Sequence, residues 1–449
     1  MTIDLFHAKR EMVKAKEETR TYNREEILEK QKQYLFPSVI TYYTEPLVVE
    51  RGKGMYLYDT DGREYLDFFG GILTVIAGHC NDTITAALVD QARTLQHVST
   101  LFPTIPQVEL AERLAQITPG RLQKSFFTNS GTEANETAIL LARAYTGRHE
   151  VVALRHSYSG RSALAMSLTA NYAWRIGGPG VSGVVHAHNA YCYRCPFEKT
   201  YPDCNLICAR DIEEMIRTAT SGQLAAFIAE PIQGVGGFVT PPKEYFPIVA
   251  EIVRRYGGVF ISDEVQTGFG RTGGKWFGIE HWGVEPDIIT AAKGMANGTP
   301  IGATIATPEI ADSLKGLTIS TFGGNPVTAR AAKATIDFLE SEKLLENAQV
   351  VGEYLKDRLK ELQEKFPLIG DVRGMGLMQG VELVRNRKTK EPAVEETKRL
   401  MDQAKDNGLI IGKGGLYGNV VRISPALTCT RTDVDIALRL LERSFSQLA

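Results

Sequence analysis

ISDEVQTGFGR, residues 261–271, joins a strand-like run to a glycine-rich turn. The run that leads into it, residues 258–262, is apolar enough to form a buried strand, and it ends in two adjacent carboxylates, Asp263 and Glu264. Open α/β sheets place their ligand-binding groups at the carboxyl ends of the strands. The stretch therefore predicts an α/β fold in which Asp263 faces a ligand at the edge of a sheet.

Three more strand-like runs lie near this stretch, at residues 151–156, 225–231 and 287–293. Segments between them, such as residues 242–257, carry apolar side chains at helical spacing. Alternation of this kind is typical of a mostly parallel sheet that is covered by helices.

The chain has 449 residues, which is long enough for more than one domain. Its character changes after about residue 325: a long amphipathic helix is expected near residues 329–343, and Thr432 with Asp435 is expected to cap a last helix. We predict an N-terminal segment that contributes to a small domain, then a large α/β domain, then a small α+β domain, at residues 1–59, 60–325 and 326–449.

The net charge and the hydropathy of the chain indicate which kinds of partner and which locations to expect. A formal net charge of −2 gives no reason to expect nucleic acid or an anionic membrane. No apolar run approaches the roughly 20 residues that span a bilayer. Residues 1–26 are charged, are spaced as a solvated helix and lack the apolar core of a secretory signal. The predicted location is therefore the cytoplasm.

Four of the six cysteines lie close together, at Cys192, Cys195, Cys204 and Cys208. The spacing C-x2-C-x8-C-x3-C is compatible with a tetrahedral zinc site, although its second interval is loose. It is also compatible with two disulfides or with four reduced thiols in a surface excursion. Nothing ties this cluster to catalysis, and no metal is expected in the reaction.

Ser130 and Glu133 form a capping-box pattern ahead of an apolar helix that closes at Gly147. The turn formed by Ser130, Gly131 and Thr132 would present free N–H groups at the positive end of this helix, and such groups bind anions. A capped helix without a ligand is the plainer interpretation when this pattern is taken alone.

Lys293 ends the strand-like run at residues 287–293. Burial among apolar groups would depress the pKa of its amine and make it nucleophilic, whereas most lysines extend along the surface. Lys293 lies 30 residues after Asp263, which is one strand–helix–strand step, so adjacent strands would bring both side chains to one edge of the sheet. A lysine, an acid and an anion cradle together are what pyridoxal phosphate requires.

The chain resembles the class III (ω-amino acid) aminotransferases of pyridoxal-phosphate fold type I, from about residue 35 to its end. The motifs that carry the resemblance are SGTEAN, AEPIQG, DEVQTGFGRTG, AAKG and TFGGNP, which begin at residues 130, 229, 263, 291 and 321. They occur in the order and spacing of the family. The resemblance implies a large domain with a mostly parallel sheet and a smaller α+β domain.

The resemblance also implies a role for each matching residue. Lys293 would bind the aldehyde carbon of the cofactor and then transfer the substrate proton, and Asp263 would keep the pyridine nitrogen protonated. Val265 and Tyr158 would lie on the two faces of the ring. The other cofactor contacts that it implies are Ser130, Gly131, Thr132, Glu230, Gln266 and Thr321. The threonine at the last position reaches the neighbouring subunit's phosphate in such proteins, which implies a homodimer with shared sites, or a tetramer built from it.

Four positions bear on the substrate. Arg422 matches the family arginine that binds the α-carboxylate of the amino acceptor. Arg161 matches the arginine that γ-aminobutyrate and ornithine aminotransferases use for a distal carboxylate, or it forms an ion pair near the cofactor. Val235 stands where those enzymes have a glutamate that pairs with the first arginine, and Ile72 stands where ornithine aminotransferases have a tyrosine. This pattern resembles the alanine–glyoxylate aminotransferase 2 and amine:pyruvate transaminase branches of the family.

These features predict an ω-aminotransferase that moves an amino group from an ω-amino acid or a primary amine to pyruvate or glyoxylate by a ping-pong mechanism. A phospholyase that acts on phosphoethanolamine-like substrates is the alternative, because such relatives use the same cofactor residues and Arg161 could bind the substrate phosphate. A non-catalytic pyridoxal-phosphate module of a transcription regulator is the third, and the lack of a basic DNA-binding segment disfavours it.

Overall fold

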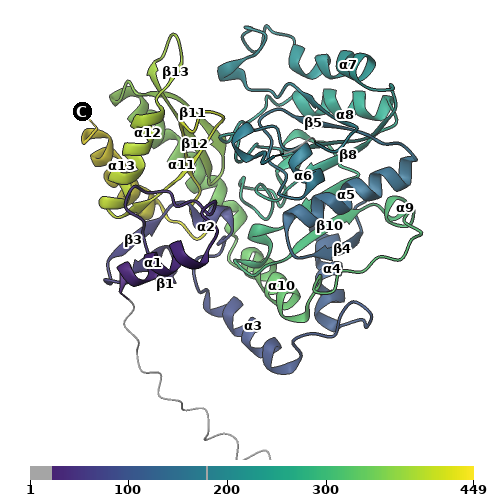
Figure 1. Ribbon diagram of the computed structural model, residues 1–449, viewed down its shortest axis with the longest axis horizontal. Helices are drawn as coiled ribbons and strands as arrows, with labels where there is room; N and C mark the ends of the chain where they lie inside the picture. The colour runs from purple at the N-terminus through teal and green to yellow at the C-terminus, as the bar shows by residue number, and fades with distance from the viewer. Residues whose placement is uncertain (1–22, 178–179, 449) are drawn as a thin grey trace, which may run out of the picture.

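The computed structural model describes residues 23–177 and 180–448 and is built around a seven-stranded sheet (Figure 1). Its strand order is β4-β10-β9-β8-β7-β5-β6. Neighbouring strands from β6 to β9 are parallel, whereas β10 runs antiparallel to both β9 and β4. The predicted α/β fold with a mostly parallel sheet is confirmed. The strands are β4 (Lys124–Thr128), β5 (Glu150–Leu154), β6 (Val184–Ala187), β7 (Leu224–Ala229), β8 (Val259–Asp263), β9 (Ile288–Ala291) and β10 (Gly302–Ala306).

Helices cover both faces of this sheet. Successive side chains of a strand point to opposite faces, so Val151 and Ile261 pack in one apolar layer with α5 (Gly131–Thr146) and α6 (Ala163–Leu168). Val152 and Phe260 pack in the other layer, with α7 (Ile207–Ala219) and α8 (Tyr245–Arg255). Burial on both faces explains why these strands are continuous apolar runs in the sequence.

Two smaller sheets lie beside the large one. The four-stranded sheet brings together distant parts of the chain, because β14 (Leu409–Ile410) pairs in parallel with β3 (Glu64–Asp67), next to β2 (Tyr56–Asp59) and β1 (Val49–Lys53). The other sheet is antiparallel and consists of β11 (Ile369–Met375), β12 (Met378–Asn386), β16 (Val420–Ile423), β15 (Gly412–Gly414) and β13 (Glu391–Pro392). The division of the chain at residues 59/60 and 325/326 stays a prediction.

The last helix, α13 (Arg431–Ser446), begins two residues earlier than expected. Thr430 caps it: its hydroxyl accepts from the Asp433 N–H at 3.2 Å, and the Asp433 carboxylate accepts from the Thr430 N–H at 2.8 Å. The predicted cap at Thr432 and Asp435 was wrong because the same Thr-x-x-Asp pattern occurs twice in this segment. Asp435 instead accepts from the hydroxyl of Tyr354 at 2.6 Å.

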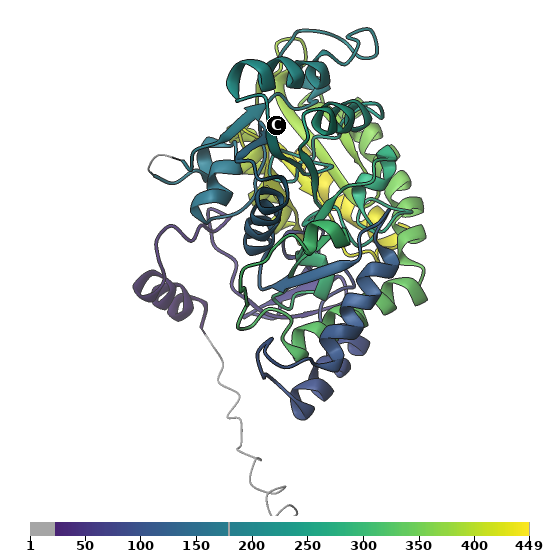
Figure 2. The same cartoon turned by 90° about the vertical axis from the view of Figure 1, so that its right-hand side faces the viewer.

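The helix α1 (Arg24–Tyr34) buries no side chain, and Figure 2 shows it apart from the body of the molecule. Most of residues 1–26, for which a solvated helix was predicted, lies outside the described residues. Among the described residues, no helix combines the length and apolar character that crossing a bilayer requires. The remaining helices are α2 (Gly70–Leu73), α3 (Asp82–Thr94), α4 (Ile105–Ile117), α9 (Pro308–Ala311), α10 (Pro326–Ser341), α11 (Leu344–Lys365) and α12 (Val394–Asp406).

Candidate active site

A cavity of about 300 Å³ lies where β7, β8 and β9 end, beside the N-terminus of α5. The carboxyl edge of parallel strands is the expected place for a ligand in this kind of fold. Nine residues that the sequence suggested for the cofactor line this cavity together: Ser130, Gly131, Thr132, Tyr158, Glu230, Asp263, Val265, Gln266 and Lys293.

Asp263 is the last residue of β8 and is buried. One carboxylate oxygen accepts from the Asn135 amide at 2.9 Å, and the other accepts from the Val265 N–H at 3.2 Å. Burial raises the pKa of Asp263, while the Asn135 and Val265 hydrogen bonds and the charge of Lys293 oppose that shift. A nearby cation stabilises a buried carboxylate of this kind.

Lys293 follows β9, the strand next to β8, so the expectation that adjacent strands place Asp263 and Lys293 at one edge is correct. Burial lowers the pKa of the lysine amine, which the charges of Asp263 and Glu230 oppose and the charge of Arg422 reinforces. Its backbone has φ = 42°, a left-handed conformation that is costly for a lysine. The amine is therefore held at the cavity in a form that is readily deprotonated.

The N-terminus of α5 forms one wall of the cavity. The Ser130 hydroxyl caps the helix by accepting from the Glu133 N–H at 3.2 Å. The Glu133 carboxylate accepts from the Asn129 N–H at 2.6 Å, one residue before the position that a capping box would use. Gly147 ends the helix in a left-handed conformation, as predicted. The N–H groups of Gly131 and Thr132 are in the first turn, where a helix provides no acceptor for them, so they can bind an anion.

The N-terminus of α5 packs closely against Val265, which follows β8. A Cβ atom on Gly131 would lie 2.9 Å from the Val265 side chain, so only glycine permits this approach. The side-chain oxygen of Gln266 is buried there without a hydrogen-bond partner, and so is that of Asn135. An anion cradle, the apolar side chain of Val265, an unpaired amide, a buried acid and an amine line one cavity, and this set of groups fits pyridoxal phosphate.

Glu230 lines the cavity and is the first residue of the loop that follows β7. Its carboxylate accepts from the Tyr158 N–H at 3.0 Å and from the Gly234 N–H at 2.8 Å. Burial and the charge of Asp263 raise the pKa of Glu230. The Tyr158 ring also packs edge-to-face on Trp174, with ring centroids 5.4 Å apart. Glu230 thus fixes the backbone at Tyr158 and at Gly234.

Arg422, on β16, is 3% exposed and forms no ion pair with a described residue. Its Nε donates to the Lys413 carbonyl at 3.1 Å, and its Nη1 is buried without a partner. The guanidinium carbon lies 5.0 Å from the ring centroid of Phe69 and 5.6 Å from that of Phe238. Arg422 is not among the residues that line the cavity, but it is near enough for its charge to lower the pKa of Lys293 there. It is a desolvated cation with a free N–H group and no carboxylate partner among the described residues.

Three other predicted residues lie outside the cavity lining. Arg161 is exposed and forms no ion pair within the described part of the chain, so the ion-pair interpretation finds no support. Thr321 is exposed in the loop before α10. Ile72 is 44% exposed and has a left-handed backbone conformation, with φ = 63°. It lies two residues before Thr74, which lines the cavity. The roles of these three stay predictions.

The four clustered cysteines form no bond with one another in this structure. Cys192, Cys195, Cys204 and Cys208 are all free thiols, and Cys208 is buried. Across residues 23–177 and 180–448, no group of three or more His, Cys, Asp or Glu side chains is arranged to hold a metal ion. The zinc and disulfide hypotheses find no support among the described residues, and the state of the four cysteines stays a prediction.

Glu264, which directly follows Asp263, has a different environment. One carboxylate oxygen accepts from the Ser262 hydroxyl at 3.0 Å and the Ile279 N–H at 2.8 Å. The other accepts from the Thr267 hydroxyl and, at 2.8 Å, from the Gly278 N–H. Burial raises the pKa of Glu264 to about 7, although these four bonds oppose the shift. Glu264 ties the turn after β8 to the 3₁₀-helix Gly278–Trp282.

We expect Glu264→Gln to lower the free energy of unfolding by about 2–3 kcal/mol, because the amide NH₂ that replaces one carboxylate oxygen must then face a buried backbone N–H that needs an acceptor. Denaturant unfolding at pH 8 measures the loss. Glu280→Gln is a matched control, since its half-buried carboxylate accepts from the Phe277 N–H at 2.8 Å at the surface of the same segment. Equal, small losses for the two variants would show that Glu264 does not organise this turn.

Sequence reasoning missed several residues that the site uses. Asn135, which holds Asp263, lies in the SGTEAN motif and one helical turn after Gly131, so its spacing could have indicated it. Phe69 and Phe238, which flank Arg422, had no such signal because they are distant from it in the chain.

The aminotransferase class-III family model matches residues 40–445. The chain is 45% identical to an alanine–glyoxylate aminotransferase 2 homologue of Arabidopsis thaliana, described as mitochondrial, over 94% of this chain and 87% of that protein. It is 40% identical to a leucine/methionine racemase of Thermococcus litoralis, over 95% of this chain and 96% of the racemase.

Solved structures agree with this assignment. An amine transaminase from an uncultivated Pseudomonas species, with pyridoxal phosphate bound, superposes with a TM-score of 0.87 at 33% identity, over 93% of this chain and 99% of that one. An Arthrobacter phospholyase in complex with phosphoethanolamine also gives a TM-score of 0.87, at 31% identity, over 94% of this chain and all of that one. The chain therefore belongs to the class-III aminotransferase family, and its cofactor is pyridoxal phosphate.

Proposed function

We propose that this protein transfers the amino group of an ω-amino acid or a primary amine to a small 2-oxo acid, pyruvate or glyoxylate, in two successive half-reactions. Arg422 carries the proposal: it is buried, keeps an unpaired N–H group and has no carboxylate partner among the described residues. Such a cation is suited to the carboxylate of an acceptor. The other substrate then needs no carboxylate at this position.

In this proposal each residue of the cavity has one task. Pyridoxal phosphate, when bound, supplies an electron sink for the bond that breaks at the substrate carbon. The N–H groups of Gly131 and Thr132 would hold its phosphate, and Asp263 would stabilise a proton on its ring nitrogen. The Lys293 amine, whose pKa burial lowers, would bind the cofactor and accept and return the substrate proton.

Val235 distinguishes this chain from enzymes that neutralise the same arginine. Its backbone carbonyl accepts from the Gly415 N–H at 2.9 Å, so the residue is fixed beside β15 and β16. A glutamate at this position could pair with Arg422 when an ω-amino acid is the substrate, whereas valine cannot. Arg422 is therefore available to the acceptor throughout the cycle.

Arg422→Ala should raise the KM for pyruvate or glyoxylate by the equivalent of about 1.5–3 kcal/mol, the cost of a lost charge-assisted hydrogen bond. A primary amine without a carboxylate should be affected far less. Half-reaction rates, measured from the cofactor absorbance with donor alone and then with acceptor alone, separate the two effects. Equal losses for both kinds of substrate would make Arg422 a structural residue.

Val235→Glu is the opposite change at the same place. The new carboxylate should pair with Arg422 and so weaken the binding of pyruvate and glyoxylate. It should raise the rate with ω-amino acid donors whose carboxylate lies near Arg161. The same two half-reactions report it. Unchanged acceptor rates in Val235→Glu would contradict the arrangement that we propose.

Phosphate elimination is the second candidate, and one observation favours it. Arg161 is exposed, lies three residues after the cavity residue Tyr158 and forms no ion pair within the described residues, so it could bind a substrate phosphate. Release of inorganic phosphate from phosphoethanolamine, without pyruvate consumption, would favour this activity. Loss of optical purity of leucine without any acceptor would instead indicate racemisation, the activity for which the Thermococcus relative is named.

A homodimer would complete the cavity. The loop that contains Thr321 exposes Leu317, Ile319 and Phe322, the last of which packs on His97 with ring centroids 5.0 Å apart. Exposed apolar groups of this kind gather where a second subunit packs. We infer that Thr321 reaches the phosphate site of a second copy, and sedimentation of the holoenzyme tests the assembly. The cytoplasmic location stays a prediction.

A further inference from the structure

A single loop, residues 230–239, connects the cofactor cavity to Arg422. At its start, the Gly234 N–H donates to the Glu230 carboxylate at 2.8 Å. At its end, the Phe238 ring lies under the guanidinium of Arg422, with 5.6 Å between the guanidinium carbon and the ring centroid. The position of Phe238 therefore helps to set the position of Arg422.

The middle of this loop is held by Arg373, on β11. The Arg373 Nε donates to the Gly237 carbonyl at 2.9 Å. Gly237 has φ = 98°, and a Cβ atom there would lie 2.9 Å from Val420 and 3.2 Å from the Arg373 guanidinium. Gly237 thus packs tightly between Arg373 and β16, the strand that carries Arg422.

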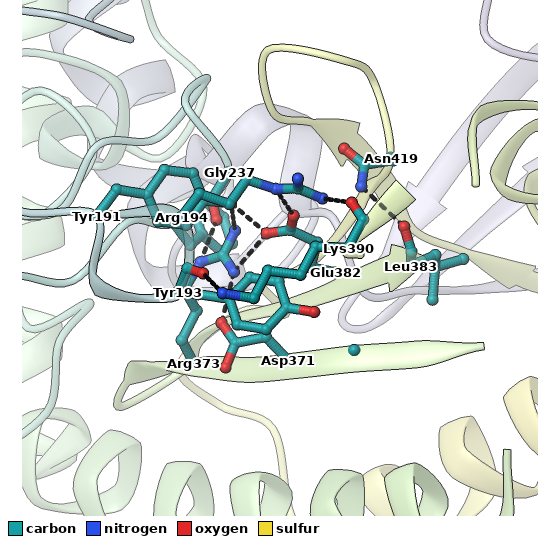
Figure 3. A network of polar contacts seen from close by, with 12 residues as sticks. Tyr191, Tyr193, Arg194, Gly237, Asp371, Arg373, Glu382, Leu383, Lys390 and Asn419 are labelled. Carbon is teal, nitrogen blue, oxygen red and sulfur yellow. Dashed lines mark hydrogen bonds and ion pairs between the residues drawn. The ribbon is translucent and has the colours of Figure 1, made fainter. Parts of the chain in front are cut away.

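Arg373 is itself fixed by a polar network, which consists of Arg373, Asp371, Glu382, Tyr191 and Arg194 (Figure 3). Its Nη1 donates to Asp371 at 2.6 Å and to Glu382 at 2.8 Å, and its Nη2 donates to the Tyr191 hydroxyl at 2.9 Å. Tyr191 and Arg194 donate to the same Glu382 carboxylate.

The network is buried and holds its members in one geometry. Only 10% of the Arg373 side chain and 1% of the Glu382 side chain are exposed. Burial tends to lower the pKa of Arg373, but Tyr191, Glu382 and Asp371 raise it by more, so its pKa is raised overall. A planar fork with several donors satisfies all of these acceptors at once, and a lysine cannot.

We propose that Arg373 is a positioning residue for the acceptor carboxylate: it holds Gly237 and Phe238 so that Arg422 keeps its place on β16, beside the cavity. None of the five network residues lines the cavity. The inference rests on the proposed function, because it assumes that Arg422 binds the acceptor. It predicts that a change at Arg373 alters the recognition of one class of substrate and leaves cofactor binding intact.

Arg373→Lys tests this proposal, because it keeps the positive charge but removes the planar guanidinium and its several donors. We expect the KM for pyruvate to rise roughly tenfold, within the range of coupling between residues in one network. The rate of the half-reaction with a carboxylate-free primary amine should stay within about twofold, since only the acceptor contacts Arg422. In an Arg422→Ala background, Arg373→Lys should cause no further increase in the KM for pyruvate.

An equal loss with the amine and with pyruvate would overturn the inference, and so would a tenfold effect that persists in the Arg422→Ala background. Arg422→Ala alone reports on the proposed function. If it leaves the KM for pyruvate unchanged, the acceptor assignment fails and the inference fails with it. If it raises that KM while Arg373→Lys does not, only the inference fails.

A milder variant and a control complete the experiment. If Arg373→Lys does not fold, Asp371→Asn removes one of the carboxylates that orient Arg373 and should raise the KM for pyruvate in the same selective way. Arg385→Met is the matched control. Arg385 lies on β12, as Glu382 does, and pairs with Glu391 at 3.0 Å and Glu396 at 2.8 Å. Its loss should leave both half-reactions unchanged, and an acceptor-selective effect there would overturn the special role of Arg373.

Discussion

Lys293→Ala is expected to abolish transamination, with a loss of roughly 10⁴-fold or more, because the variant loses both the amine that binds the cofactor and the base that carries the proton. The visible absorbance of the covalently held cofactor should disappear as well. The fold should remain, because a desolvated lysine amine contributes little favourable energy to folding.

Circular dichroism and the midpoint of thermal unfolding without cofactor establish that the Lys293→Ala protein is folded. This control comes first, because a loss of activity in an unfolded variant would say nothing about the role of Lys293. Transamination by the folded variant at even a few per cent of the normal rate, with an amine donor and pyruvate, would contradict the assignment of Lys293. Another amine would then have to form the bond with the cofactor.

Asp263→Asn is expected to retain the cofactor and to slow both half-reactions by about 10²–10³-fold, the scale on which a group aimed at developing charge contributes. A neutral amide no longer favours a proton on the ring nitrogen. The new amide can accept from the Val265 N–H or from the Asn135 amide but not from both, because the Asn135 NH₂ must also donate to the Ser159 carbonyl at 3.0 Å.

Both half-reactions are informative for Asp263→Asn, because each depends on the same electron sink. Stopped-flow absorbance with an amine donor, and then with pyruvate, gives the two rates. A near-normal rate in either direction would mean that another acid faces the ring nitrogen. Loss of cofactor, in contrast, would show that Asp263 mainly holds the cofactor in place.

Much of the large sheet could be predicted from the sequence because its strands are buried on both faces. The run at residues 258–262 is apolar enough to mark a strand and is followed by an acid, and the structure places β8 there with Asp263 as its last residue. The antiparallel direction of β10 could not be predicted, because strand direction depends on the path of the connecting chain and not on the residues of the strand.

Local capping patterns were informative where only one register was possible. Ser130 and Gly147 bound α5 as expected, since no other pair of residues fits that helix. At the start of α13 the pattern occurs in two registers, and in the structure Asp435 accepts from the Tyr354 hydroxyl instead of capping the helix. That choice depends on tertiary packing, which a local pattern does not contain.

The cofactor side of the site was more predictable than the substrate side. Asp263 and Lys293 follow neighbouring strands, so their meeting follows from the topology of a parallel sheet. The surroundings of Arg422 combine Phe69, Phe238 and a loop that Arg373 fixes, which come from separate parts of the chain. Contacts of this kind arise only when the three sheets are assembled.

The most direct test of the proposed activity follows one nitrogen atom. The holoenzyme is incubated with a ¹⁵N-labelled primary amine or ω-amino acid and with unlabelled pyruvate or glyoxylate, and the products are analysed by mass spectrometry. We predict that the label appears in alanine or glycine in an amount equal to the carbonyl product of the donor. Release of the label as ammonia, with no label in alanine or glycine, would contradict transfer to a small 2-oxo acid.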